Sequence, residues 1–461
     1  MHIEGSVVPE REGPRSRPVP RALQPFSSPQ YRILVGALTL SLLGSGIWLV
    51  ALVWQVIDLG GGPAELSGVA AANAVGMLGT VLLGGVLADR VPQKRILLAV
   101  EVLKALAIGS AGVLAVTGSL EVWHLAVVSL AYGIAEGCFY PAYSAWLPSL
   151  LPAEHLLAAN GVEGVLRPAA MQAGGPALGA ALIAASSPGT ALLVIAAAQT
   201  LAAGILAFTR ATPVRRDVER GGAVRGALVD IAEGFRYLLR TSWLLGTLLF
   251  ACLLILVIMG PIEVLLPFAV RDQTGGGAGA FALVLAMFGV GGAIGSIVVA
   301  SLPLPRRYLT AMNLLWGAGC VPMALIGLTD QLWLMAVVMF AVGFTFQAGG
   351  VLWGTLLQRR VPPALLGRVS SLDFFVSLAL MPVSMALAGP VGELVGTSVP
   401  FLVAGLVPPV LALAALLIFR MGRDELAHPL DGSAPAGASA EPRPVGDAPV
   451  PVASPIDAAL D

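Results

Sequence analysis

The sequence is short of charge. Asp, Glu, Lys and Arg make up only 11% of its 461 residues, whereas a typical soluble domain has about 25%. A soluble protein of this size needs many more charged side chains to cover its surface, so the composition excludes a soluble enzyme. The formal net charge of −1 leaves no cationic excess for binding nucleic acid. Because 57% of the residues are hydrophobic, the chain as a whole is not disordered.

Groups for metal, redox or hydrolytic chemistry are also scarce. Cys138, Cys252 and Cys320 stand in apolar runs with no C-x-x-C spacing, which is typical of small buried hydrophobic residues. The four histidines form no H-E-x-x-H motif, and no G-x-x-x-x-G-K-[S/T] loop for ATP is present. We therefore expect no cofactor, no metal site and no enzyme activity, a membrane-embedded acyltransferase or protease included.

Long apolar runs, in contrast, are abundant. A helix of about 20 apolar residues crosses the hydrocarbon layer of a membrane. Twelve runs of about this length predict an all-α integral membrane protein with twelve transmembrane helices, near residues 33–57, 66–88, 96–117, 123–146, 161–185, 189–209, 244–268, 279–300, 308–328, 331–353, 371–396 and 399–419.

Lys and Arg are distributed unequally between the two sides of these spans. Of the 26 Lys and Arg residues, Arg271 alone falls on the side away from the termini, and Lys104 and Arg167 fall inside spans. Cytoplasmic loops carry the excess of Lys and Arg, so we expect a multi-pass protein of the plasma (inner) membrane with both termini in the cytoplasm. The first 30 residues hold no apolar core of signal-peptide length, and we expect no cleavage there.

The chain divides into two similar halves. We expect six-helix bundles over 31–210 and 243–420, a cytoplasmic linker with an amphipathic helix over 211–242, and disordered cytoplasmic tails over 1–30 and 421–461. LPAEHLLAANGVEG (151–164) aligns with VPPALLGRVSSLDF (361–374), which indicates a parallel repeat. Such repeats place a binding site between the halves near the middle of the membrane.

The loop between the second and third spans carries the best-defined motif, GGVLADRVPQKRIL (84–97). It resembles the signature of the major facilitator superfamily, G-x-L-A-D-R-x-G-R-K/R, with Pro92 and Gln93 as departures. The matching residues include Gly85, Asp89, Arg90, Lys94 and Arg95. The resemblance extends over about 31–420 and implies a monomeric transporter that works by alternating access. It also implies that this loop helps to lock the outward-facing state, although a basic loop obeying the positive-inside rule is the simpler alternative.

A second motif, AGGPALGA (173–180), lies in the fifth span. Gly175, Pro176 and Gly179 match part of the antiporter motif of the same superfamily, G-x-x-x-G-P-x-x-G-G, while Met171 and Ala180 replace two of its glycines. The resemblance implies proton-driven export. The alternative is a Gly/Pro kink that serves only helix packing.

Charged residues inside the spans are the third signal, because a charge at membrane depth is costly and usually functional. Glu101 and Lys104 stand three residues apart on one helix face, and Glu136 lies about 15 Å deep, the deepest acid in the chain. We predict an ion pair between Glu136 and Arg167, joined by Glu101 and Lys104, with Glu136 as the proton-coupling carboxylate. The alternative is a purely structural ion pair.

Other candidates are weaker. Glu263 in the seventh span is read as a second protonation site or a docking carboxylate for cationic substrates, or else as a hydrated acid. Trp48 and Tyr140 are candidate cavity aromatics, with helix packing as the alternative. Asp373, at the cytoplasmic edge of its span, is read as a cap or loop partner.

These observations favour a proton-coupled exporter of a small amphipathic molecule such as a drug, secondary metabolite or siderophore. The segment 356–382 resembles the drug- and siderophore-exporting branch of the superfamily. The expected partners are this substrate, protons and the lipid bilayer, with no nucleic acid. An importer of a small nutrient and a non-transporting receptor or scaffold remain as alternatives.

Overall fold

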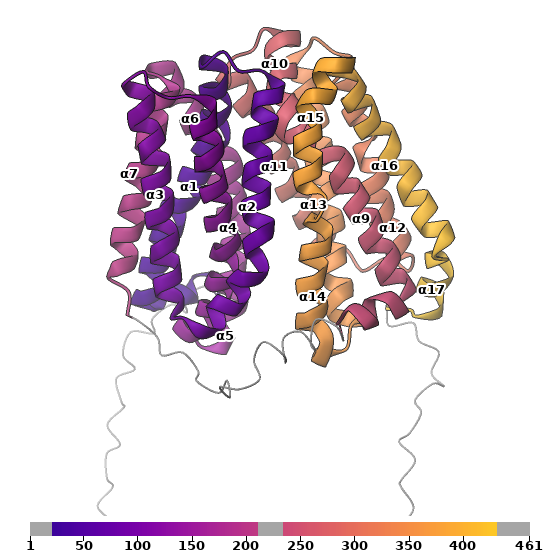
Figure 1. Ribbon diagram of the computed structural model, residues 1–461. Helices are drawn as coiled ribbons and strands as arrows, with labels where there is room; N and C mark the ends of the chain where they lie inside the picture. The colour runs from indigo at the N-terminus through magenta and orange to yellow at the C-terminus, as the bar shows by residue number, and fades with distance from the viewer. Residues whose placement is uncertain (1–20, 211–233, 431–461) are drawn as a thin grey trace, which may run out of the picture.

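The computed structural model describes residues 21–210 and 234–430, and all regular structure in these two ranges is helical. The helices form two upright bundles that stand side by side (Figure 1). The first bundle holds residues of the first half of the chain and the second bundle those of the second half. The expected all-α membrane fold with two bundles is therefore present.

Helices of the first bundle run back and forth along its length (Figure 1). They are η1 (Arg21–Ser27), α1 (Pro29–Asp58), α2 (Pro63–Arg90), α3 (Gln93–Val116), α4 (Val122–Leu150), α5 (Ala153–Arg167), the π-helical turn η2 (Pro168–Gly174), α6 (Gly175–Ala185) and α7 (Pro188–Ala207).

The second bundle repeats this course. Its helices are α9 (Ser242–Gly260), the π-helical turn η3 (Pro261–Leu265), α10 (Leu266–Thr274), α11 (Ala278–Ser301), α12 (Tyr308–Gly317), η4 (Ala318–Leu325), α13 (Leu332–Arg360), α14 (Pro363–Leu378), α15 (Met381–Val395), α16 (Ser398–Ile418) and α17 (Met421–Ala427).

Helix starts follow from local sequence. Pro29 and Pro188 occupy first-turn positions, where the missing N–H costs no hydrogen bond. The hydroxyl of Ser28 accepts a hydrogen bond from the N–H of Tyr31 (3.4 Å), and that of Ser187 accepts one from Thr190 (3.2 Å). Prolines and short polar caps therefore set the connections between apolar runs that would otherwise have no clear ends.

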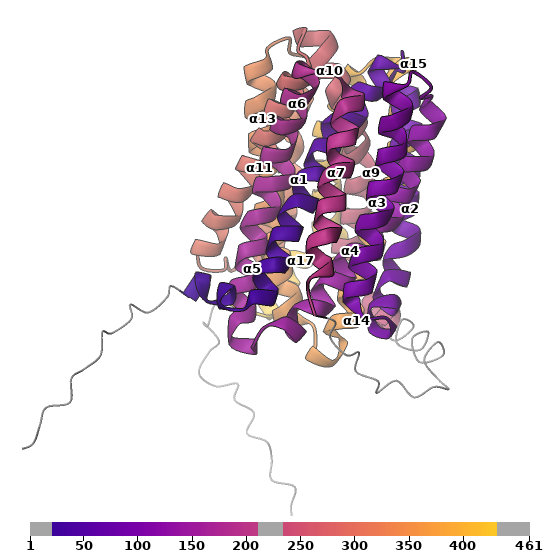
Figure 2. The ribbon, with the colours of Figure 1, turned by 90° about the vertical axis from the view of Figure 1, so that its left-hand side faces the viewer.

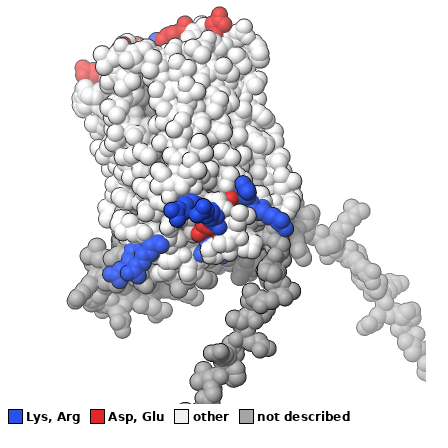
Figure 3. Space-filling view, turned by 90° about the vertical axis from the view of Figure 1, so that its right-hand side faces the viewer, with Lys and Arg blue, Asp and Glu red and all other residues white. Residues whose placement is uncertain are grey.

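The two ends of the molecule differ in charge (Figure 3). We call one the basic end, because its α2–α3 and α11–α12 connections and the adjoining helix ends carry Arg90, Arg95, Arg306 and Arg307. We call the other the acidic end, because its connections and helix ends carry Asp58, Asp272, Asp330 and Glu393. Between them, large apolar side chains such as Leu106 and Val410 are exposed. An apolar belt between two polar ends is what a lipid bilayer requires.

By length and composition, ten helical runs among the described residues suit a membrane span. They do not include α2 or the run from α5 to α6, although both follow the same lengthwise course (Figure 1). The membrane class is thus confirmed, whereas the full count of twelve spans stays a prediction.

The expected tail boundaries need correction. Residues 21–27 form η1, which packs against α5 at the basic end (Figure 2), and α1 already begins at Pro29. Residues 421–427 form α17, whose buried Glu425 accepts hydrogen bonds from the N–H groups of Leu309 (2.8 Å) and Thr310 (3.0 Å). The acid thereby caps the start of α12, a contact that composition alone does not reveal. Residues 1–20, 431–461 and most of the linker (211–233) lie outside the described range.

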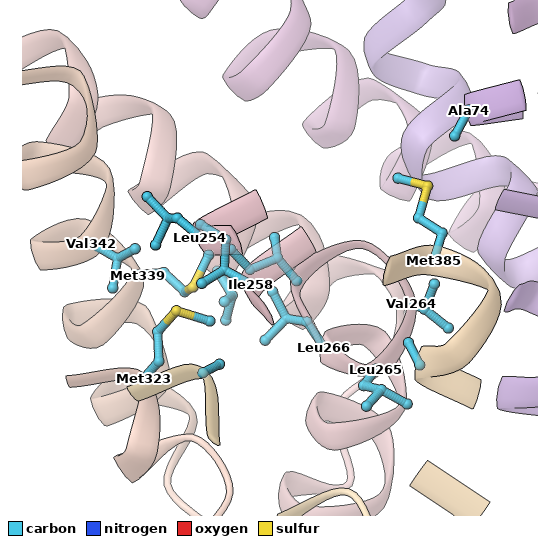
Figure 4. Close-up of a cluster of buried hydrophobic side chains, with 14 of the residues drawn as sticks. Ala74, Leu254, Ile258, Val264, Leu265, Leu266, Met323, Met339, Val342 and Met385 are labelled. Carbon is cyan, nitrogen blue, oxygen red and sulfur yellow. The ribbon is translucent and has the colours of Figure 1, made fainter. Parts of the chain in front are cut away.

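The bundles meet at the acidic end, where α2 packs against α15. The N–H of Gly389 donates to Ser67 Oγ (2.6 Å), and Glu393 Oε1 accepts from the N–H of Ala64 (3.1 Å). A Cβ on Gly389 would lie 2.1 Å from the carbonyl oxygen of Pro63, so this approach requires glycine. Deeper along the same contact, Met385 of α15 points toward Ala74 of α2 (Figure 4).

Candidate functional site

A cavity of about 810 Å³ lies between the bundles, on the basic-end side of the α2–α15 contact. The first bundle contributes side chains from α2, α4, α5 and η2, among them Glu136, Tyr140 and Arg167. Gln347 of α13 and Phe374 of α14 come from the second bundle. A volume of this size suits a drug-sized ligand, for which pockets range over about 300–1,000 Å³.

A buried ion pair connects the wall of this cavity to the interior of the first bundle. Lys104 of α3 is only 1% exposed, and its ammonium group pairs with Glu136 of α4, whose side chain is 25% exposed and lines the cavity. The rings of Tyr132 and Phe139 lie 5.1 Å and 5.2 Å from Lys104 Nζ. A carboxylate and two aromatic faces thus compensate the buried ammonium group.

Glu101 extends this network away from the cavity. It is 1% exposed, and its Oε1 accepts a hydrogen bond from Ser41 of α1 (2.7 Å). Its Oε2 is buried without a hydrogen-bond partner among the described residues. The cluster therefore holds two acids, Glu101 and Glu136, but one base, Lys104, which leaves one negative charge uncompensated when both acids are ionised.

The predicted ion pair between Glu136 and Arg167 is wrong. Arg167 Nη2 instead lies 2.9 Å from Glu163 Oε1, one turn earlier on α5, and its guanidinium group lies 5.6 Å from the centre of the Tyr140 ring. Depth along a span gives the height of a side chain, whereas the rotation of each helix decides which neighbour it faces. Lys104 reaches Glu136 because α3 and α4 pack together.

The first half has glycine where many superfamily exporters carry an arginine in the fourth span. A Cβ on this residue, Gly133, would lie 2.0 Å from the carbonyl oxygen of Asn73 in α2. No side chain fits between the two backbones, so an arginine is sterically excluded there. The buried cation comes from Lys104 of α3 instead.

The loop motif is only partly described. Helix α2 ends at Arg90, and the surroundings of Gly85 and the side chain of Asp89 lie outside the described set. Lys94 Nζ donates to the carbonyl oxygens of Ala207 (2.8 Å) and Thr209 at the end of α7, while Arg95 is exposed. Lys94 thus caps a neighbouring helix end, and the locking role of the loop stays a prediction.

The antiporter-like motif lies in a tight helix contact. A Cβ on Gly175 would lie 2.5 Å from the Cα of Gly46 in α1, and one on Gly179 would lie 3.2 Å from the carbonyl oxygen of Ile47. Pro176 is buried in the first turn of α6, directly after the π-helical turn η2. This geometry accounts for the motif by packing, as in the structural alternative, and leaves its link to export a prediction.

The structure places the weaker candidates, Tyr140, Trp48 and Glu263, in three different environments. Tyr140 lines the cavity and is 52% exposed, whereas Trp48 is buried and stacks on Tyr132 with ring centroids 5.3 Å apart. Trp48 is thus a packing residue. Glu263 in η3 is exposed, forms no hydrogen bond or ion pair with any described side chain, and lines neither this cavity nor the smaller pocket described next.

A second pocket of about 240 Å³, which the sequence did not predict, lies inside the second bundle. We call it the side pocket; its lining includes Trp316, Phe346, Trp353, Asp373, Phe374 and Ser377. Asp373 Oδ2 accepts a hydrogen bond from Trp353 Nε1 (2.9 Å), so it is a pocket residue and not only a cap. Tryptophans inside two different spans were the available signal, but their convergence depends on helix rotation.

Comparison with known proteins assigns this chain to a family. The family model of the major facilitator superfamily described as "Transmembrane secretion effector" matches residues 21–433. A multidrug efflux pump, Tap, of Mycolicibacterium fortuitum is 28% identical over 415 residues, which cover 87% of this chain and 98% of the pump. Macrolide efflux protein A of Streptococcus pyogenes is 25% identical over 387 residues, covering 81% and 92%.

Solved structures share the fold at low identity. The nucleoside transporter NupG superposes with a TM-score of 0.65 at 15% identity, covering 85% of this chain and 99% of that one. The inward-open xylose transporter XylE from E. coli gives a TM-score of 0.62 at 12% identity, covering 85% and 96%.

Proposed function

This chain belongs to the major facilitator superfamily of membrane transporters, and we propose that it is a proton-coupled exporter of a small amphipathic molecule such as a drug, secondary metabolite or siderophore. The observation that carries the proposal is the buried cluster of Glu101, Lys104 and Glu136 in contact with a cavity between the bundles. We further propose that the chain acts as a monomer in the plasma membrane.

The arrangement of the bundles supports alternating access. The halves are joined at the acidic end by α2 and α15, and the cavity lies toward the basic end. The excess of Lys and Arg assigns the basic end to the cytoplasm. The described conformation is then inward-facing and able to load substrate from the cytoplasm, and rocking of the bundles would deliver it to the opposite side.

Charge balance in the cluster supports proton coupling. One proton on Glu101 or Glu136 makes the cluster of two acids and one base neutral, and its loss leaves a net negative charge at membrane depth, which is costly. Glu136 is the member that lines the cavity, so it is the group through which a proton enters or leaves. The charge of Lys104 also acts on Glu101, whose Oε1 accepts a hydrogen bond from Ser41 of α1. We propose that a change at Glu136 reaches α1 through this cluster.

The named relatives favour export over the alternatives. Two of them are described as efflux proteins, one for multiple drugs and one for macrolides. The nucleoside and xylose transporters support the fold only, at 15% and 12% identity. An importer on the same scaffold is the second candidate.

Proteoliposomes with an imposed pH gradient test the proposal. Glu136→Gln should abolish gradient-driven transport of a fluorescent amphipathic drug and its associated proton movement, because the amide carries no titratable proton. Glu163→Gln is the matched control, since Glu163 lines the same cavity but pairs with Arg167 outside the cluster. Equal gradient-driven flux in Glu136→Gln and the wild type would refute the coupling role, and uptake in place of efflux would favour the importer.

A further inference from the structure

The side pocket combines an aromatic enclosure with one carboxylate. Its lining includes four aromatic rings, from Trp316 of α12, Phe346 and Trp353 of α13, and Phe374 of α14. The ring centroids of Trp316 and Trp353 lie 6.3 Å apart, and those of Trp316 and Phe346 lie 6.5 Å apart. Trp316 Nε1 donates to the carbonyl oxygen of Phe346 (2.9 Å), and Trp353 Nε1 donates to Asp373. Both indole donors are thus occupied, and the rings contribute apolar surface to the lining of the pocket.

Asp373 has no cationic partner among the described side chains. Its oxygens accept from neutral donors only, Trp353 Nε1 at 2.9 Å and Ser377 Oγ at 3.3 Å. Arg360 of α13, one of several described cations of this bundle, lies over the ring of Trp243 (4.8 Å) and pairs with Asp424 of α17. A cationic ligand would therefore supply this carboxylate with the counter-charge that no described side chain provides.

The side pocket adjoins the larger cavity between the bundles, which we call the central cavity. Phe374 lines both, so one side chain forms the wall between them. With about 240 Å³ the side pocket is smaller than the ~300 Å³ lower limit of typical ligand pockets, whereas the central cavity of about 810 Å³ falls within the usual range. A ligand that uses both spaces would place a compact group beside Asp373 and its larger body in the central cavity.

We propose that the side pocket binds the cationic head of an amphipathic organic cation, a quaternary ammonium or protonated amine. Aromatic faces with a nearby carboxylate are the environment that recognises such a group, because the ring quadrupoles and the negative charge both attract it. The inference names the substrate class of the exporter proposed above and rests on that function for transport, but binding itself needs no proton gradient.

Equilibrium binding of benzyltrimethylammonium to the purified full-length protein in lipid nanodiscs tests the site. The first comparison uses the wild type alone: benzyltrimethylammonium should bind at least about tenfold more tightly than neopentylbenzene, its uncharged analogue of the same shape. Equal affinity for the two probes, or no binding of the cation, would overturn the proposal. This comparison stays valid whether or not a variant folds.

Variants then locate the site. Asp373→Asn should raise the dissociation constant of benzyltrimethylammonium at least about tenfold, while Asp330→Asn, which removes an exposed carboxylate at the acidic end, should leave it unchanged. Size-exclusion chromatography checks that both variants remain monodisperse. Unchanged binding in Asp373→Asn would place the cation elsewhere and refute the assignment. Cation binding without gradient-driven efflux would leave the site standing and refute the exporter.

Discussion

The two bundles repeat one helical plan but differ in how they treat buried charge. In the first bundle, Lys104 pairs with Glu136 and lies near Glu101, so a buried cation partly neutralises the two acids. In the second, Asp373 lies among tryptophans and accepts hydrogen bonds from neutral groups. We infer that the repeat supplies a scaffold whose halves have specialised, the first for the coupling ion and the second for the substrate.

Each bundle has a Gly-Pro pair in a corresponding span, Gly175-Pro176 in α6 and Gly389-Pro390 in α15, and the helix contacts that these pairs make differ as well. Gly175 of α6 packs on Gly46 of α1, within the first bundle, whereas Gly389 of α15 packs on Pro63 and Ser67 of α2, across the two bundles. Gly175 thus allows two helices of the first bundle to pack closely, whereas Gly389 allows the two bundles to pack against each other at the acidic end. Similar sequence positions therefore need not have the same mechanical role.

The largest effect should follow from removing the internal cation. Lys104→Met leaves Glu101 and Glu136 without their base, and losing one partner of a buried ion pair costs about 3–5 kcal/mol. We expect a markedly lower unfolding temperature in detergent, measured by intrinsic fluorescence. Lys104→Met combined with Glu101→Gln should recover part of the loss because it removes one uncompensated acid; no recovery would contradict the charge balance.

An intermediate effect should distinguish the two glycine joints. An added methyl group at either place meets backbone atoms, and overpacking costs about 1–3 kcal/mol. Gly389→Ala should separate α2 from α15 and shift the protein toward a state open at the acidic end, seen as longer distances between spin labels on the two bundles there. Gly175→Ala should lower the unfolding temperature without that shift. The same distance change in both variants would refute the distinction.

The smallest effect should come from giving the second bundle a cation of its own. Ser377→Lys places an ammonium group one turn after Asp373, so the carboxylate becomes paired as in the first bundle. Binding of benzyltrimethylammonium should weaken about tenfold, or about 1.4 kcal/mol, with no loss of stability. Ser377→Ala is the control, and we expect its affinity to remain close to that of the wild type. Undiminished binding in Ser377→Lys would show that Asp373 does not hold the cation.

Much of the fold was predictable from residues 33–419. Apolar runs are local, and prolines such as Pro63 and Pro188 mark helix starts, so the two bundles and the course of most helices follow from composition and spacing. The loop and Gly-Pro motifs also carried the family resemblance. The prediction failed at the tail boundary, where α17 is short and is held by Glu425 contacting α12, more than 110 residues earlier in the chain.

For the candidate site, the sequence by itself determined which charges stand at membrane depth, because few ionisable residues interrupt the apolar runs. It therefore identified Glu101, Lys104, Glu136 and Arg167. Only the tertiary structure decided their partners: Glu136 forms an ion pair with Lys104, and Arg167 forms one with Glu163. The physical reason is that depth depends on the rise along one helix, whereas pairing and the assembly of Trp316, Trp353 and Asp373 depend on how several helices rotate against each other.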